Sequence, residues 1–242
     1  MMPLPTIATP TYELKLPSTN KKIKYRPFLV REEKVLIIAL DSKDQDEMTN
    51  AVKDVLSKCI LTDGINVDQL PTFDIEYVFL NIRAKSIGED IRLTVTCPDD
   101  GETQVSTTIY VDEVKVIKAK NHKKDIVLDD KLTLRMKYPS LDQFINSNFQ
   151  SDDNPEVVVD KTFQVIADCI ETVYTEEEAW EGSDFSNEER MKFIEQLNSK
   201  QYKKVEEFFT TMPKLSHTFE VVNPNTKKKN KIVLEGLADF FG

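Results

Sequence analysis

Glycine is scarce in this chain of 242 residues, which holds only six, and they form no cluster. A phosphate-binding loop needs several glycines at close spacing so that the backbone can approach the ligand. The Gly-x-Ser-x-Gly turn that exposes a hydrolase nucleophile is also missing. The glycine pattern therefore argues against a nucleotide site and against a serine hydrolase of this type.

Cysteine is rarer still. Cys59, Cys97 and Cys169 are too few and too scattered for a disulfide framework. Cys59 and Cys169 fall on the apolar stripes of two expected helices. We therefore interpret them as buried thiols of a protein made in a reducing compartment.

The segment Thr96-Cys-Pro-Asp-Asp-Gly101 resembles one knuckle of a zinc ribbon, but Asp100 stands where the second cysteine would be. Tetrahedral zinc needs four ligands, usually thiolate or imidazole, and the chain has only two histidines, His122 and His217. We predict a tight β-turn with Gly101 at a positive φ and no bound metal. Whether this turn derives from a metal knuckle stays open.

The sequence also lacks long apolar runs and a surplus of Lys and Arg over Asp and Glu. The sequence has neither an apolar stretch of membrane-spanning length nor a leader that ends in a small-residue cleavage site. The formal net charge is −10, whereas nucleic acid and anionic membranes bind surfaces with a surplus of Lys and Arg. We expect no nucleic-acid partner, no membrane partner, and a protein that stays in the cytoplasm where it is made.

Paired carboxylates are abundant, but acid–base catalysis needs a buried carboxyl group with a displaced pKa. These groups lie in expected turns or on polar faces, where solvated charge is their ordinary role: 99–100, 129–130, 152–153 and 176–178. We predict that the protein is not an enzyme, and that it has no catalytic residue, no metal and no cofactor.

Apolar residues recur at helical or alternating spacing along most of the chain. The pattern predicts hairpins at 12–26, 91–111, 126–138 and 217–234, and helices at 28–40, 44–61, 72–87, 141–149, 157–174, 186–197 and 200–212. The predicted class is α+β, with several β-hairpins, amphipathic helices and a helix-rich C-terminal third.

The domain organisation follows from composition. Residues 1–10 hold three prolines and no apolar period, which is typical of a flexible arm. Residues 11–242 are expected to form a single α+β domain, and a division into the sub-units 11–138 and 139–242 is left open.

The helix expected at 28–40 follows directly on a basic strand. Its apolar positions are expected on one inner face (Leu29, Val35, Leu36, Ala39 and Leu40), and its charged positions outside (Arg31, Glu32 and Lys34). Arg26, Phe28 and Arg31 at this junction are our candidates for partner contact. Alternatively, the two arginines satisfy helix-end carbonyls or pair with Glu32 and Glu33.

Aromatic residues in polar surroundings are the other candidates for partner contact. Trp180, the single tryptophan, and Phe185 lie in an acidic stretch. Each either folds back onto the core or anchors a partner, and we favour folding back. Phe240 and Phe241 near the carboxyl end present the same choice, between capping the core and docking into a neighbouring subunit.

Three motifs follow one another in the first third of the chain: Tyr12-Glu-Leu-Lys-Leu-Pro-Ser18, Arg26-Pro-Phe-Leu-Val-Arg-Glu-Glu-Lys34 and Phe73-Asp-Ile-Glu-Tyr-Val-Phe-Leu80. In their order and spacing they resemble the T4-type contractile-tail phage baseplate proteins, the group involved in building the baseplate hub. The likeness covers residues 5–96 and returns at 232–241.

This resemblance implies a bacteriophage protein made in the host cytoplasm during infection. Its task would be assembly of the tail baseplate central hub, as a chaperone-like factor or as a structural component of the finished virion. Its partners would be other baseplate or tail hub proteins, and no catalytic residue or cofactor is carried over. The identity of the partner, the stoichiometry and homo-oligomerisation are left open.

Of the roles considered, we favour the assembly factor. A stable structural subunit would bury large apolar surfaces permanently, so helices between residues 28 and 82 would carry exposed apolar positions in the isolated chain. An enzyme such as a tail-associated hydrolase would need a cleft with one perturbed carboxyl group, and no pair of carboxylates is singled out for that task.

Overall fold

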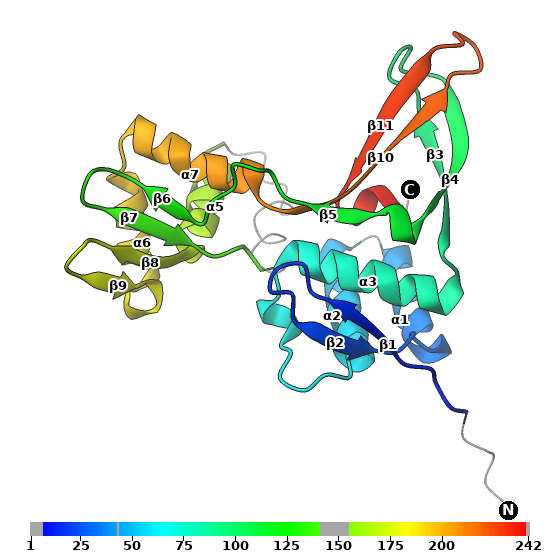
Figure 1. Ribbon diagram of the computed structural model, residues 1–242, viewed down its shortest axis with the longest axis horizontal. Coiled ribbons are helices and arrows are strands. Elements are labelled where there is room, and N and C mark those ends of the chain that lie inside the picture. The colour runs from blue at the N-terminus through cyan, green and yellow to red at the C-terminus, as the bar shows by residue number, and fades with distance from the viewer. Residues whose placement is uncertain (1–6, 43, 141–154, 241–242) are drawn as a thin grey trace, which may run out of the picture. The chain divides into compact units, whose positions relative to one another are not determined.

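The computed structural model describes residues 7–42, 44–140 and 155–240. Its contacts divide the chain into two compact units (Figure 1). Unit 1 consists of Met1–Val67, Phe73–Ile117 and Lys214–Gly242, and unit 2 of Asp68–Thr72 and Lys118–Pro213. The single domain over 11–242, its sub-units and the arm at 1–10 stay predictions.

Unit 1 begins with the expected hairpin and helices. The strands β1 (Tyr12–Lys15) and β2 (Lys22–Tyr25) pair antiparallel. Three helices follow, α1 (Val30–Ser42), α2 (Gln45–Cys59) and α3 (Thr72–Ile87). The short 3-10 helix η1 (Val67–Gln69) precedes α3, and its last two residues belong to unit 2.

Helix α2 shows why this region folds as the sequence predicts. Asp44 caps it by accepting a hydrogen bond from the Glu47 amide at 3.0 Å. The buried residues Val52, Val55 and Cys59 follow helical spacing, so the helix presents one continuous apolar stripe to the core. The thiol of Cys59 is fully buried, as predicted.

The second half of unit 1 is built from hairpins. The strands β3 (Asp90–Thr96) and β4 (Gln104–Tyr110) form one two-stranded sheet. A three-stranded antiparallel sheet has the order β11-β10-β5 and consists of β5 (Lys115–Ile117), β10 (Lys214–Val222) and β11 (Lys229–Glu235). The short 3-10 helices η2 (Val111–Glu113) and η4 (Ala238–Phe240) complete the unit. Leu80 and Ala84 of α3 share one apolar core with both hairpins.

Most of unit 2 is an insertion between two paired strands of unit 1. Lys214 in β10 pairs with Ile117 in β5, so the chain leaves unit 1 and returns to it at adjacent positions of one ladder. An inserted segment whose ends lie side by side can form its own core without breaking the host sheet.

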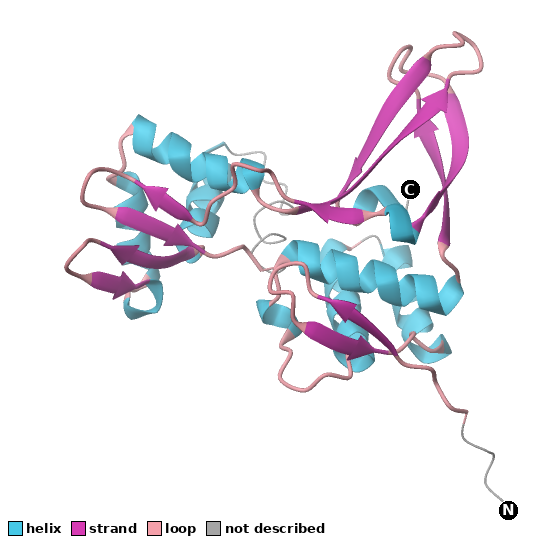
Figure 2. Cartoon of the chain, viewed as in Figure 1, coloured by secondary structure: helices cyan, strands magenta, loops and turns pink. Residues whose placement is uncertain are grey.

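Unit 2 contains a four-stranded antiparallel sheet of order β6-β7-β8-β9. Its strands are β6 (Asp125–Val127), β7 (Thr133–Met136), β8 (Ile170–Tyr174) and β9 (Ala179–Glu181). The helices are α5 (Pro155–Asp168), the 3-10 helix η3 (Gly182–Asp184), α6 (Asn187–Glu195) and α7 (Ser199–Thr211). Figure 2 shows helices and strands in both units, and the predicted α+β class is confirmed.

The helix expected at 157–174 is wrong in its last part. Helix α5 ends at Asp168, and residues 170–174 form β8 between β7 and β9. The segment Ile170–Tyr174 contains three β-branched residues, and both neighbouring strands satisfy its backbone, so sheet pairing outweighs continuation of the helix. Cys169 lies fully buried at the junction. The helix expected at 141–149 falls outside the described residues.

Candidate protein-binding surfaces

The junction between β2 and α1 is organised around Glu32. Its carboxylate accepts hydrogen bonds from the Leu29 amide at 2.7 Å, from Arg31 Nε at 2.7 Å and from Arg26 Nη2 at 3.2 Å. The Glu32 side chain is only 2% exposed. The expectation that Glu32 lies on the outer face of the helix is therefore wrong. The three donors compensate its buried charge. Burial raises the pKa of Glu32, but the bonds from Arg31, Arg26 and Leu29 outweigh burial and lower it to about 2.

This geometry matches the alternative in which Arg26 and Arg31 pair with Glu32. Arg26 also donates to the Pro27 carbonyl at 2.9 Å, and its side chain is 12% exposed. Phe28 is buried, whereas the Arg31 side chain is 73% exposed. Partner contact by these three residues stays a prediction, and Arg31 is the one that the isolated chain presents to solvent.

Helix α1 presents apolar residues to solvent. The relative exposures are 79% for Val30, 58% for Ile37 and 58% for Ile38, and the spacing i, i+7, i+8 sets these residues on one side of the helix. Leu29 and Val35, which we expected inside, are 38% and 37% exposed. We call Val30, Ile37 and Ile38 the α1 apolar surface. The core contact of the helix is made by Ala39, which we expected inside, and by Glu32, which we expected outside.

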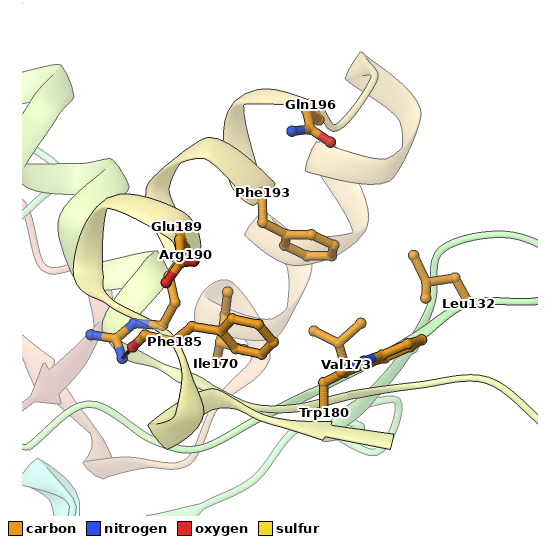
Figure 3. Close-up of a pocket in the computed structure, with 9 residues that line it drawn as sticks. All are labelled: Leu132, Ile170, Val173, Trp180, Phe185, Glu189, Arg190, Phe193 and Gln196. Carbon is orange, nitrogen blue, oxygen red and sulfur yellow. Dashed lines mark hydrogen bonds between the residues drawn. The ribbon is translucent and has the colours of Figure 1, made fainter. Parts of the chain in front are cut away.

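Unit 2 contains a groove between its sheet and α6. The groove has a volume of about 420 Å³ and is lined by Leu132, Ile170, Val173, Trp180, Phe185, Glu189, Arg190, Phe193 and Gln196. Figure 3 shows the side chains of Trp180, Phe185 and Phe193 around a common space, with Val173 and Ile170 also on its wall. Its walls are therefore mainly aromatic and aliphatic, which is typical of a site that holds an apolar group.

The chain after β9 is held in place by two local features. Gly182 packs so closely on β8 that a Cβ atom there would overlap the carbonyl oxygen of Ile170. Arg190 donates to the carbonyls of Gly182 at 2.9 Å and Phe185 at 3.1 Å, and to Asp168 at 3.2 Å. These contacts fix the turn that carries Phe185 to the groove.

Helix α6 starts with the capping box that the sequence predicts. The Ser186 hydroxyl accepts from the Glu189 amide at 3.3 Å, and the Glu189 carboxylate accepts from the Ser186 amide at 2.8 Å. These bonds lower the pKa of Glu189, so the carboxylate on the groove wall is firmly ionised.

Trp180 and Phe185 are thus neither detached from the fold nor fully enclosed by it. Trp180 is 37% exposed and Phe185 is half-buried, and both lie on the groove wall. Folding back has occurred, and it leaves an apolar surface open. The role of Trp180 in partner contact stays a prediction.

Carboxylates are frequent in the segments that line this groove or adjoin it. Six exposed acidic residues lie on its wall or in the adjoining turns: Glu176, Glu177, Glu178, Asp184, Glu188 and Glu189. We call these six the acidic rim. The basic neighbours are Lys131 and Lys192, which are exposed, and Arg190 on the groove wall, which pairs with Asp168 at 3.2 Å; together they leave the surroundings net negative.

The Cys97 turn is held by hydrogen bonds. Gly101 has φ +72°, as predicted, and the Gly101 amide donates to the Cys97 carbonyl at 2.9 Å. Asn223, at the tip of the β10–β11 hairpin, donates to Asp99 and to Asp100, each at 2.8 Å. Among the described residues no group of three potential metal-ligating side chains is found.

The end of the chain packs into unit 1. Phe240 is 1% exposed in the core shared by both hairpins, which is the core-capping alternative. Phe241 lies outside the described residues. The Leu237 amide donates to the Glu76 carboxylate at 3.0 Å, and burial raises the pKa of Glu76 to about 7.

Comparison with known proteins identifies the class. The chain matches the family of T4 bacteriophage base plate proteins over residues 9–242, nearly its whole length. The chain therefore belongs to this family, whose setting is the tail baseplate of the virion. No curated protein and no solved structure matches the chain. Within the described part of the chain, every helix is too short or too polar to cross a membrane.

Sequence reasoning missed the α1 apolar surface and the groove for different reasons. Helical spacing placed Val35 and Leu29 on an inner face, but a helix with apolar residues on two sides does not reveal which side is covered. The groove depends on β8, which we predicted as helix. The acidic run with the single tryptophan was the only signal for it.

Proposed function

We propose that this base plate protein acts without catalysis, through protein–protein contacts, in assembling the central hub of the tail baseplate. The proposal includes its retention as a structural component of the finished particle. The observation that carries retention is the α1 apolar surface.

An exposed apolar face of this kind has a cost in an isolated chain. Monomeric proteins rarely expose contiguous apolar patches, and larger ones usually mark an interaction site. Covering the exposed part of Ile37 or Ile38 would contribute about 1 kcal/mol each. A lasting interface gains this free energy permanently, whereas a transient factor would expose the surface again after each cycle.

The surroundings of the surface also suit a protein partner. Arg31 is 73% exposed and lies beside the apolar positions, and Lys34 is exposed on the same helix. An apolar centre with charged neighbours is the usual composition of a protein interface. Other baseplate or hub proteins, made in the same host cytoplasm, are the partners that the family suggests.

The role as a chaperone-like factor that leaves the particle is the alternative. The two roles differ in one observable, the presence of the chain in mature particles. We would measure peptides of this chain by quantitative mass spectrometry in purified virions and in lysate of infected cells. A fixed copy number per virion is expected. Abundance in lysate together with absence from virions would contradict retention and support the transient factor.

A further inference from the structure

We propose that the groove of unit 2 binds a segment of a partner protein that inserts one aromatic or aliphatic side chain and flanks it with Lys or Arg. This site is separate from the α1 apolar surface and does not depend on retention in the virion.

The apolar part of the proposal rests on the lining. Trp180, Phe185 and Phe193 form the aromatic walls, and Val173 and Ile170 contribute aliphatic carbon (Figure 3). A volume of about 420 Å³ suits one or two large side chains rather than a folded element. Partly exposed tryptophan in such a place is the residue type that most often dominates binding free energy.

The wall is also preorganised. The capping box at Ser186 and the contacts of Arg190 with Gly182 and Phe185 hold α6 and the turn that carries Phe185 in place before any ligand arrives. Binding then requires little ordering of the groove, and more of the contact energy appears as affinity.

The basic flanks follow from the acidic rim. Its six carboxylates lie in the turn that leads into β9, beside Phe185 and in the first turn of α6. Lys131, Lys192 and Arg190 offset only part of this charge. A segment with Lys or Arg on both sides of its apolar anchor is attracted to the acidic rim whichever way the segment runs, whereas an acidic segment is repelled.

The same charge argues against other classes of ligand. Anionic lipid surfaces and nucleic acid would meet the rim with like charge. A small cation would be attracted, but it would leave the aromatic walls uncovered. A basic and apolar protein segment satisfies both parts of the site.

Trp180 makes the test direct, since it is the single tryptophan of the chain and lies on the groove wall. We would titrate the full-length protein with the capped peptide Lys-Arg-Leu-Phe-Arg-Lys and record tryptophan emission. Two further peptides separate charge from anchor: Glu-Asp-Leu-Phe-Asp-Glu and Lys-Arg-Ser-Ser-Arg-Lys. A saturable change is expected with the first peptide alone.

A charge-reversed variant tests the rim. The triple variant E176K/E177K/E178K changes only exposed side chains and should weaken binding of the basic peptide by about tenfold or more. The matched control E102K/D112K/E206K carries the same change in net charge at exposed positions whose residues do not line the groove. The control should bind as the wild type does, and circular dichroism would check that both variants are folded.

Three results would overturn the proposal. These are no saturable change up to millimolar peptide, an equal response to the acidic or the serine peptide, or an equal loss in both triple variants. None of them bears on the count of the chain in virions, so failure of this inference is distinguishable from failure of the proposed function.

Discussion

The side-chain amide of Asn223 donates a 2.8 Å hydrogen bond to Asp99, which lies 124 residues earlier in the chain. The same amide donates to Asp100 at 2.8 Å, and the Thr226 hydroxyl also donates to Asp99. These bonds tie the tips of the two long hairpins of unit 1 together (Figure 1). Bonds from Thr226 and Asn223 lower the pKa of Asp99, and bonds from Thr103 and Asn223 lower the pKa of Asp100, so the turn keeps two ionised carboxylates side by side.

Removal of this amide should loosen the hairpin tips. Asn223 is fully buried, and its own Oδ1 accepts from the Asn225 amide at 2.8 Å. We expect Asn223→Ala to lower the free energy of unfolding by about 2–3 kcal/mol, measured by urea denaturation. Asn225→Ala removes one exposed bond, to Thr103, and should cost less than about 1 kcal/mol. Equal losses in the two variants would contradict a special role for Asn223.

Glu32 should stabilise the protein in a defined range of pH. Its folded pKa of about 2 lies below the ordinary value of 4.5, so its contribution is complete above pH 4.5 and is lost as the pH falls toward 2. At pH 7, Glu32→Gln should cost about 1–2 kcal/mol, because Arg26 loses its buried counter-charge. Glu33→Gln, on the same helix, is the control and should stay within about 0.5 kcal/mol of the wild type. If the Glu32→Gln variant loses stability at acid pH in the same way as the wild type, the proposed role of Glu32 is refuted.

Glu76 should make the protein less stable as the pH rises, which is the opposite of the effect of Glu32. Its raised pKa of about 7 means that the folded state binds the proton more tightly than the unfolded state, so stability decreases as the pH rises from 4.5 to 7. Glu76→Gln keeps an acceptor for the Leu237 amide and removes the charge. At pH 8 we expect this variant to be more stable than the wild type by about 1–3 kcal/mol, measured by chemical denaturation. Glu102→Gln, at an exposed position, should show the wild-type pH profile.

Gly182 should be required for the fold of unit 2 around the groove. A methyl group at this position would overlap the Ile170 carbonyl oxygen, so β8 and the following turn must shift. We expect Gly182→Ala to lower the free energy of unfolding by about 2–3 kcal/mol and to shift the emission of Trp180. Ser183→Ala changes the exposed neighbour and should leave both observables unchanged. A Gly182 variant with wild-type stability would show that the turn adapts at low cost.

The α1 apolar surface should matter for incorporation and little for folding. Ile37→Ser together with Ile38→Ser changes two residues that are each 58% exposed, so the free energy of unfolding should change by less than about 1 kcal/mol. In a phage that carries this double variant, the copy number of the chain per virion should fall strongly. The matched double variant Val222→Ser and Val233→Ser, in the β10–β11 hairpin, should leave the copy number unchanged. Loss in both would indicate a general defect.

Local chemistry in the sequence determined many elements without help from the rest of the fold. The β10–β11 hairpin follows from alternation around the turn that begins at Asn223. Helix α6 follows from its capping box, and α2 from a single apolar stripe with Asp44 as its cap. In each case the residues that specify the element lie within a few positions of one another. Both partners of each local interaction can therefore be recognised from the sequence alone. The family motifs could also be recognised, because their order and spacing are properties of the sequence itself.

Only the tertiary structure decided the features on which our proposals rest. Residues 170–174 are compatible with a helix until β7 and β9 supply hydrogen bonds on both sides. Glu32 looks like a solvated charge until Arg26 folds against it. Leu29 and Val35 look like core residues from helical spacing, but in the fold they are 38% and 37% exposed. The groove needs Leu132 from the β6–β7 turn, Val173 from β8 and Phe193 from α6. Each of these outcomes depends on partners far away in sequence, and the local pattern carries no information about which surface those partners cover.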